Sequence, residues 1–389
     1  MKKNTLIIII FLVVAALIVA GWIIFFSSQE QAPGTGLSPA PVLSQTPQIS
    51  LSPSPTSFSA QQFEKITDHL VLNPVFASNT VSFFDKTDGF FKNVVPVLDI
   101  FKENKASEIV FENVFSVSFS PSRKVALVGF YQGQIIRKFA VFDIQQNLNY
   151  LLPDFVKEAV WSVDSVKLLV NHSLPSRGEA YFSTINFDGT KEAKVLDLGL
   201  NDVKYFWPNQ NLIIFYEKPS PGYPVDKIFS YDLKNKKISL INFSLRESYK
   251  SGFYGFDLLP SPDGKAILFS LTDQAGANLR TFLQNLETSQ IVELDFKTLV
   301  QKCAWTSDSA EIVCAYSDEL KNAFSLPFDY WMGKVKSNDS FVKFNLLTGE
   351  KKIYAEKTGF DALNFSLSAE KNFLLFTNQA DQSLYRMRL

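Results

Sequence analysis

Length, composition and charge exclude some classes of protein. The chain has 389 residues and a formal net charge of −1, which gives no electrostatic footprint for binding nucleic acid. His69 and His172 are its only histidines, and neither has a carboxylate or Cys at ligand spacing in the sequence, so we expect no His-based metal site. The sequence also lacks a glycine-rich phosphate loop and a Gly-x-Ser-x-Gly nucleophile motif, and we predict no cofactor.

The first predicted element is a membrane-spanning helix at residues 6–26. The run is apolar and uncharged, and at about 1.5 Å per residue it spans about 31 Å, close to a hydrocarbon core of about 30 Å. Lys2 and Lys3 precede it and no positive charge follows until Lys65. The positive-inside rule therefore predicts a single-pass protein of the cell membrane, with residues 1–5 in the cytoplasm and the rest outside. The alternative is a cleaved signal peptide.

The next segment, residues 27–62, is predicted to be a disordered linker. It is rich in Pro, Ser, Thr and Gln, and residues 31–63 contain no charged side chain. Such a sequence cannot bury enough apolar surface to offset its chain entropy. We therefore expect it to act as a spacer.

From residue 63 onward the chain is organised around a repeated hairpin. Its clearest copy has the turn Ser261-Pro262-Asp263-Gly264 between a short strand and the apolar run 266–269, and these residues suit a type I turn. The hairpin recurs about every 40 to 60 residues, a period typical of propeller blades. The other copies lie at residues 73–84, 117–128, 159–170, 205–215, 303–314 and 363–376.

Each hairpin is followed by an alternating strand, a tight polar turn and a more polar strand. Units of four strands predict an all-β fold, a seven-bladed β-propeller over residues 63–389. The last unit ends at Leu389 after three strands. Residues 64–70 resemble the fourth strand of the other units, so we expect them to close the ring by pairing the two ends of the domain.

These residues carry a resemblance to a known family. Ser261-Pro262-Asp263-Gly264 after a first strand, followed by an apolar strand and an Asp-x-x-x-Gly turn, resembles the TolB-type, WD-repeat-like propellers. The Gly-His and Trp-Asp dipeptides of eukaryotic WD repeats are absent. The resemblance implies the fold. It implies no single function, because such propellers serve as periplasmic interaction modules, peptidase gates and enzymes alike.

Loop lengths point to a binding surface. The long links join the second and third strands of the units, and in a four-stranded meander these links all emerge at one end of the ring, here called the loop face. Loops on a rigid scaffold usually carry recognition residues. One long link contains Tyr223, and the longest contains Phe328, Tyr330 and Trp331, aromatic residues of the kind enriched at interfaces. The alternative is that Phe328, Tyr330 and Trp331 fold back to cover the ring.

The leading hypothesis is a membrane-anchored extracytoplasmic module that binds or scaffolds an unknown protein or glycan partner at the loop face, with no catalytic activity. One alternative is a gating propeller that serves a partner hydrolase. Another is a cell-surface carbohydrate-active enzyme, a hydrolase or lyase, with two convergent carboxylates in a central cleft. The carboxylates considered for that role are Glu217, Asp226, Asp318, Glu319 and Asp329.

The only two cysteines, Cys303 and Cys314, are symmetric about Asp308-Ser309. Strand residues directly opposite one another across a hairpin have Cα atoms about 4.5 to 5.5 Å apart, within reach of a disulfide. The predicted compartment permits oxidation. A turn longer by one residue would shift the register and leave two buried free thiols, so both outcomes stay open at this point.

Overall fold

The computed structural model describes residues 62–77, 80–97, 100–174, 179–243, 245, 252–321 and 323–389. The predicted membrane helix at 6–26 lies outside these residues, as does the predicted linker at 27–62 apart from Gln62. Within the described ranges, no helix is long and apolar enough to cross a membrane.

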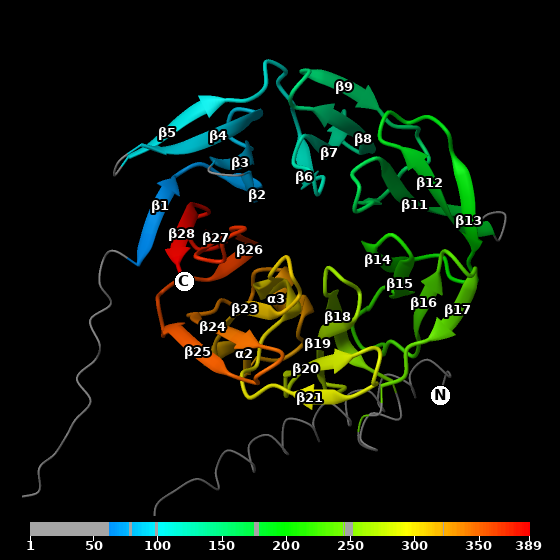
Figure 1. Cartoon of the computed structure of the whole chain (residues 1–389), viewed down its shortest axis with the longest axis vertical. Helices are drawn as coiled ribbons and strands as arrows, with labels where there is room; N and C mark the ends of the chain where they lie inside the picture. The colour runs from blue at the N-terminus through cyan, green and yellow to red at the C-terminus, as the bar shows by residue number, and fades with distance from the viewer. Residues whose placement is uncertain are drawn as a thin grey trace, which may run out of the picture. The chain divides into compact units, whose positions relative to one another are not determined.

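The described residues form seven four-stranded antiparallel sheets arranged as a ring, which confirms the predicted seven-bladed propeller (Figure 1). The first blade is β2 (Val71–Ala77), β3 (Thr80–Asp85), β4 (Phe90–Val97) and β5 (Ile100–Lys105). The second is β6 (Val114–Phe119), β7 (Val125–Gln132), β8 (Ile136–Asp143) and β9 (Leu148–Leu151). The third is β10 (Ala159–Trp161), β11 (Lys167–Leu174), β12 (Glu179–Asn186) and β13 (Ala193–Asp197).

The remaining blades follow the same order. The fourth is β14 (Val203–Asn209), β15 (Leu212–Glu217), β16 (Ile228–Asp232) and β17 (Lys237–Leu240). The fifth is β18 (Tyr254–Pro260), β19 (Ala266–Thr272), β20 (Arg280–Asn285) and β21 (Ile291–Glu293). The sixth is β22 (Cys303–Trp305), β23 (Glu311–Tyr316), β24 (Ser340–Asn345) and β25 (Lys351–Ala355). The seventh combines β26 (Ala362–Leu367), β27 (Phe373–Asn378) and β28 (Leu384–Arg388) with β1 (Phe63–Thr67).

The seventh blade closes the ring as predicted. β1 pairs antiparallel with β28, with Phe63 opposite Met387 and Glu64 opposite Arg386. Arg386 Nε donates to Glu64 Oε2 at 3.1 Å, which fixes the pairing at this outer position. β1 is the outer strand of the seventh blade, so the first and the last described strands pair in one sheet and close the ring (Figure 1).

The repeated hairpin depends on a hydroxyl group more than on glycine. In the fifth blade, Ser261 Oγ accepts the Ala266 N–H at 2.9 Å, and Gly264 closes the turn with φ of +72°. Four other blades keep a Ser or Thr as the first turn residue and place a side chain, not glycine, in the left-handed region. These left-handed residues are Arg123, Ser165, Ser309 and Lys371. In three of these copies the hydroxyl of Ser162, Thr306 or Ser368 accepts a backbone N–H as Ser261 does. This hydrogen bond therefore supports the turn in copies that lack the sequence Pro-Asp-Gly.

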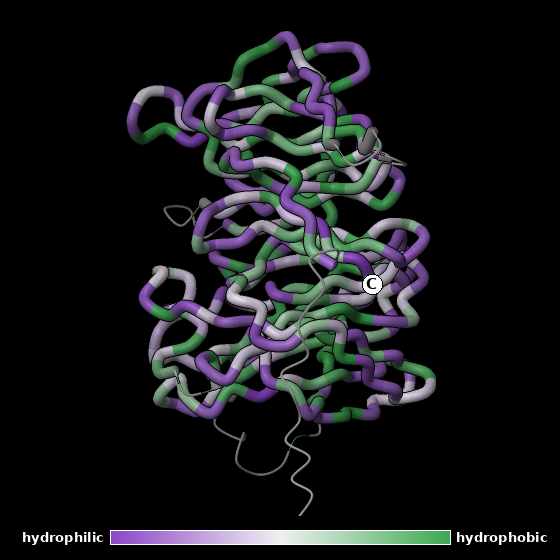
Figure 2. Tube along the Cα trace, turned by 90° about the vertical axis from the view of Figure 1, so that its left-hand side faces the viewer, coloured by the Kyte–Doolittle hydropathy of each residue, from purple (hydrophilic) through white to green (hydrophobic). Residues whose placement is uncertain are grey.

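The core lies between neighbouring blades. The second strand of each blade is buried on both faces, as in β19, where every residue from Ala266 to Thr272 is buried. Phenylalanines stack across adjacent strands, with the ring centroids of Phe269 and Phe282 5.1 Å apart. Seen from the side, hydrophobic strands fill the body of the ring and hydrophilic residues gather at its turns (Figure 2). This packing explains why the second strands read as continuous apolar runs.

The two ends of the ring differ. The loop face carries the links between second and third strands and the links between blades. The opposite end, here called the turn face, carries the repeated hairpin turns and the links between third and fourth strands. β1 is a fourth strand and runs toward the loop face, so the described chain enters the domain at the turn face with Gln62.

Candidate functional site on the loop face

The largest feature of the loop face is the insertion at residues 317–339, between β23 and β24. It contains the short helices α2 (Asp318–Lys321) and α3 (Phe328–Trp331), and Figure 1 shows α3 on the inner side of the sixth blade. Leu326 and Tyr330 are buried in a cluster with Leu279 and Leu299. The insertion is thus packed against the blades by its own hydrophobic contacts.

Two glycines allow the insertion to come this close. A Cβ atom at Gly276 would lie 2.4 Å from Ser325 Cα, and one at Gly255 would lie 2.7 Å from the Leu326 carbonyl oxygen. Both glycines also have positive φ, +73° and +55°. The Leu326 N–H donates to the Gly276 carbonyl at 2.9 Å. Side chains at these two positions would push the insertion off the ring.

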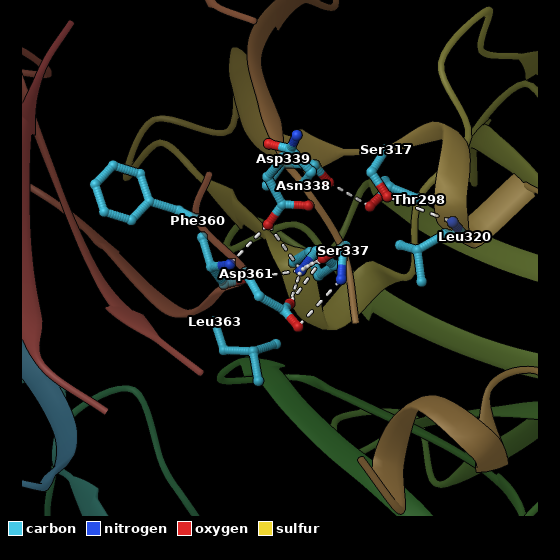
Figure 3. Close-up of polar contacts among 12 residues, drawn as sticks. Thr298, Ser317, Leu320, Ser337, Asn338, Asp339, Phe360, Asp361 and Leu363 are labelled. Carbon is cyan, nitrogen blue, oxygen red and sulfur yellow. Dashed lines mark hydrogen bonds and ion pairs between the residues drawn. The ribbon is translucent and has the colours of Figure 1, made fainter. Parts of the chain in front are cut away.

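A buried ion-pair network fixes the far side of the insertion. Lys302, in the 3-10 helix η3 (Val300–Lys302), has no exposed surface. Its Nζ lies 2.9 Å from Asp339 Oδ2, 2.9 Å from Asp361 Oδ1 and 2.9 Å from Tyr330 Oη. The Tyr330 hydroxyl donates to Asp361 Oδ1 at 2.5 Å, and Ser337 Oγ donates to the same oxygen at 2.7 Å. Figure 3 shows the Asp361 carboxylate directed at Ser337.

The two carboxylates in this network differ in pKa. Burial raises the pKa of Asp339, and the Lys302 ammonium only partly opposes it. Burial also acts upward on Asp361, but Lys302 and the Tyr330 hydroxyl lower its pKa below the usual value overall. Burial and the Asp361 charge raise the pKa of Tyr330, so its phenol stays protonated and donates. The network holds the insertion in place and is closed to solvent.

The four aromatic residues predicted to bind a partner therefore fall into different environments. Tyr223 is 72 % exposed and Trp331 is 43 % exposed, whereas Tyr330 is 1 % exposed. Phe328 is half-buried, and its ring packs edge-on against Trp331 with centroids 5.2 Å apart. The expectation that Tyr330 contacts a partner needs correction, because its hydroxyl is hydrogen-bonded within the Lys302 network and its ring is buried. The alternative, that the segment folds back over the ring, describes Tyr330.

The structure brings Tyr223 and Phe328 together. They line one pocket of about 220 Å³ with Tyr254 and Leu326, at the loop-face ends of the fourth, fifth and sixth blades. Tyr223 belongs to the link between β15 and β16, and Phe328 to the insertion, so no local sequence pattern joins them. The pocket is small, and polar and glycine residues line it together with the aromatic rings. Trp331 packs against Phe328 outside this lining. The pocket can hold an apolar or aromatic side chain of a partner.

The carboxylates considered for catalysis are partly separated. Glu217 and Asp226 line one cavity of about 380 Å³ between the third and fourth blades. Asp329 is ion-paired with Lys334 at 3.0 Å, and Glu319 Oε2 accepts the Asn338 N–H at 3.4 Å. The structure therefore gathers two of the five carboxylates, and it does so between blades and not in a central cleft.

One cluster of residues of the kinds that bind metals was not predicted from the sequence. Among the described residues, His69, Asp85 and Glu103 place ligand atoms within 4.8 Å of one another. However, the buried Lys92 Nζ lies 2.6 Å from Asp85 Oδ2, 2.6 Å from Glu103 Oε1 and 2.8 Å from Asp88 Oδ2. Burial alone would lower the pKa of Lys92, but hydrogen bonds to these three carboxylates raise it. The ammonium supplies the positive charge that the cluster needs, so we propose no metal there.

The two cysteines lie directly opposite each other in β22 and β23. Their Cα atoms are 4.1 Å apart and their sulfur atoms are bonded. This is the register expected for strands paired about Asp308-Ser309. Formation of the disulfide in the cell stays a prediction, which is tested below.

Comparison with known proteins adds information on the fold. No family model and no curated protein sequence matches the chain. Solved structures do match. An oligogalacturonate lyase from Vibrio parahaemolyticus gives a TM-score of 0.60 at 10% identity over 85% of this chain and 94% of that chain. The β-propeller domain of the Trilobed protease from Pyrococcus furiosus gives 0.51 at 12% identity over 82% and 95%.

TolB from Acinetobacter baumannii also matches, with a TM-score of 0.44 at 11% identity over 80% of this chain and 63% of that chain. That score is too low to argue from. At these identities the likenesses show a shared propeller fold and nothing finer. They include an enzyme and a domain of a protease, so the expectation that this chain has no catalytic activity finds no support in them.

Proposed function

We propose that this chain is a membrane-tethered extracytoplasmic binding module whose loop face receives a protein partner. The observation that carries the proposal is the pocket lined by Tyr223 and Phe328, to which the insertion contributes, together with the exposed aromatic and apolar side chains of that insertion. Aromatic residues in preformed pockets are the usual centres of protein interfaces. The partner and its binding are proposed from this surface alone.

The surface around the pocket has the composition of an interface. Besides Tyr223 and Trp331, the insertion exposes Phe324 and Met332. Charged residues such as Asp329 and Lys334, paired at 3.0 Å, stand beside them. An apolar centre with charges at its rim is typical of protein–protein contacts. A net charge of −1 does not favour the binding of nucleic acid.

The tether fits this arrangement. We propose that residues 6–26 anchor the protein in the cell membrane and that residues 27–62 are the spacer. The described chain enters the propeller at the turn face through Gln62 and β1, whereas the pocket beside Tyr223 lies at the loop face. The proposed partner at the loop face includes a hydrolase for which the propeller acts as a gate.

A second candidate function rests on the cavity that holds Glu217 and Asp226. Two carboxylates in one cavity are the minimum for glycoside hydrolysis, so a carbohydrate-active enzyme is the competing proposal. In that case, Glu217→Gln would abolish release of reducing sugar from a glycan substrate. The binding module would show no such product with either variant or wild type.

The binding proposal is tested by site-specific photo-crosslinking in intact cells. A photoreactive phenylalanine analogue is placed at Tyr223 in one variant and at Leu347 in the control. Leu347 is 87 % exposed on the turn face, so the two positions are similarly accessible. We expect a crosslinked product of higher mass from position 223 only. Equal products from both positions, or a product from position 347 only, would contradict the proposal.

A further inference from the structure

A cavity of about 650 Å³ lies at the loop-face end of the interface between the second and third blades. We propose that it binds a small organic anion that carries one carboxylate and several hydroxyl groups. This proposal is independent of the protein-binding surface, which lies on the fourth to sixth blades. The volume falls within the range of roughly 300 to 1,000 Å³ that is usual for small-molecule sites.

The charges that line the cavity favour an anion. Lys218 Nζ lies 2.8 Å from Glu158 Oε2 and 3.1 Å from Asp202 Oδ1, so one ammonium meets two carboxylates at the rim and these groups keep one net negative charge. The two other cations of the lining are Arg137 and Lys157. No carboxylate in the described ranges is ion-paired with either of them. The Lys157 ammonium donates to the Asp154 carbonyl oxygen at 2.9 Å.

Arg137 lies beside two aromatic rings. Its guanidinium carbon lies 5.1 Å from the ring centroid of Phe115 and 5.9 Å from that of Tyr131. Cation–π attraction of this kind favours a position of the guanidinium near the rings and uses none of its N–H groups. A planar guanidinium matches a carboxylate through two parallel hydrogen bonds. With Lys218 included, the lining has three cations and two carboxylates. This excess of one positive charge suits a single negative charge better than a phosphate dianion.

Neutral polar groups complete the lining. Asn171 Oδ1, from β11, is buried and has no hydrogen-bond partner. A buried acceptor of this kind requires a donor from a ligand or from water. Asn201 and the hydroxyl groups of Ser116 and Ser173 also line the cavity. These groups can bind hydroxyls of a polyhydroxylated ligand while Arg137 binds its carboxylate.

The site is built on rigid elements. Its walls are strands of the second and third blades, and its rim is fixed by the Tyr205 hydroxyl, which donates to the Glu158 carbonyl at 2.8 Å. Lys218 ties Glu158 to Asp202 and so joins two successive links between blades. The ligand would therefore find the polar groups already in position.

The test is calorimetric titration of the full-length protein in detergent with D-glucuronate, D-glucose and inorganic phosphate. We expect saturable binding of glucuronate, and binding of glucose and phosphate at least tenfold weaker. Arg137→Gln should weaken glucuronate binding about tenfold or more, since it removes a charge-assisted contact. The matched control is Lys124→Gln, which removes a positive charge on the turn face and should leave the affinity unchanged.

Each outcome decides the proposal. The proposal would be overturned if glucuronate at about 10 mM did not saturate the protein, because its binding would then be weaker than that of a millimolar site. Equal affinity for glucose, preferential binding of phosphate, or equal weakening by Arg137→Gln and Lys124→Gln would also overturn it. Arg137→Gln should leave the crosslink at position 223 intact, so failure here is distinguishable from failure of the protein-binding proposal.

Discussion

Lys302 shows how much one buried side chain contributes to the loop face. Its ammonium is fully buried between Asp339 and Asp361. Lys302→Met would keep the volume and leave two carboxylates without their cation, which costs about 3 to 5 kcal/mol when one partner of a buried pair is removed. Denaturant unfolding should show a loss of that size. Lys334→Met, which breaks the exposed pair with Asp329, is the control and should cost at most about 1 kcal/mol. Equal losses would contradict the assignment.

His172 makes stability depend on pH. It is buried in β11, stacked on Tyr181 with centroids 4.3 Å apart, and its Nε2 lies 2.8 Å from Ser183 Oγ. Burial lowers the pKa of His172, although Glu192 raises it in part. The unfolded chain therefore takes up a proton near pH 6.5, and the folded chain takes it up at a lower pH.

The contribution of His172 to the free energy of unfolding should therefore be constant above about pH 6.5. Below that value the free energy of unfolding should fall as the pH drops, by at most about 1.4 kcal/mol per pH unit. Comparison of wild type with His172→Gln by denaturant unfolding between pH 8 and pH 5 isolates the effect, since all other groups are shared. The variant should show the shallower slope. Parallel curves would mean that His172 does not titrate differently on folding.

At the scale of elements, the β22–β23 hairpin carries the only covalent cross-link. Cys303 and Cys314 close a loop of about 12 residues, and the chain-entropy account limits its stabilisation to about 3 kcal/mol. Alkylation of the denatured protein without reductant should leave both thiols unmodified in mass spectrometry, and alkylation after reduction should modify two. Two alkylated thiols without reductant would show that the bond does not form.

The elements also show what the sequence could predict. The turn residues Ser261 and Gly264 report a local hairpin, and such local signals identified the seven blades and the closing strand β1. Lys302 and Asp361, by contrast, are far apart in the chain, and no spacing rule pairs them. The same holds for Asp85 and Glu103 around Lys92. Burial of Tyr330 agrees with the alternative that this segment folds back over the ring, but the partners of its hydroxyl could not be predicted because they come from other links.

For the whole molecule, the arrangement of cavities refines the prediction about its two ends. The pocket beside Tyr223 and the 650 Å³ cavity open at the loop face, as expected from the long links. The turn face is not featureless, since cavities of about 580 Å³ and 350 Å³ lie among its hairpins near Asp263. What distinguishes the loop face is its exposed aromatic side chains, so side-chain chemistry and not shape decides between the two ends.

The measurement that tests the central claim most directly is the affinity of the crosslinked partner for two double variants. Tyr223→Ala with Trp331→Ala changes the loop face, and Lys124→Ala with Leu347→Ala changes the turn face. Both should melt like the wild type, because all four side chains are exposed. We predict that the first variant loses about 2 kcal/mol or more of binding free energy and the second almost none. Equal binding by both variants, or a loss confined to the second, would contradict the claim that the partner binds at the loop face.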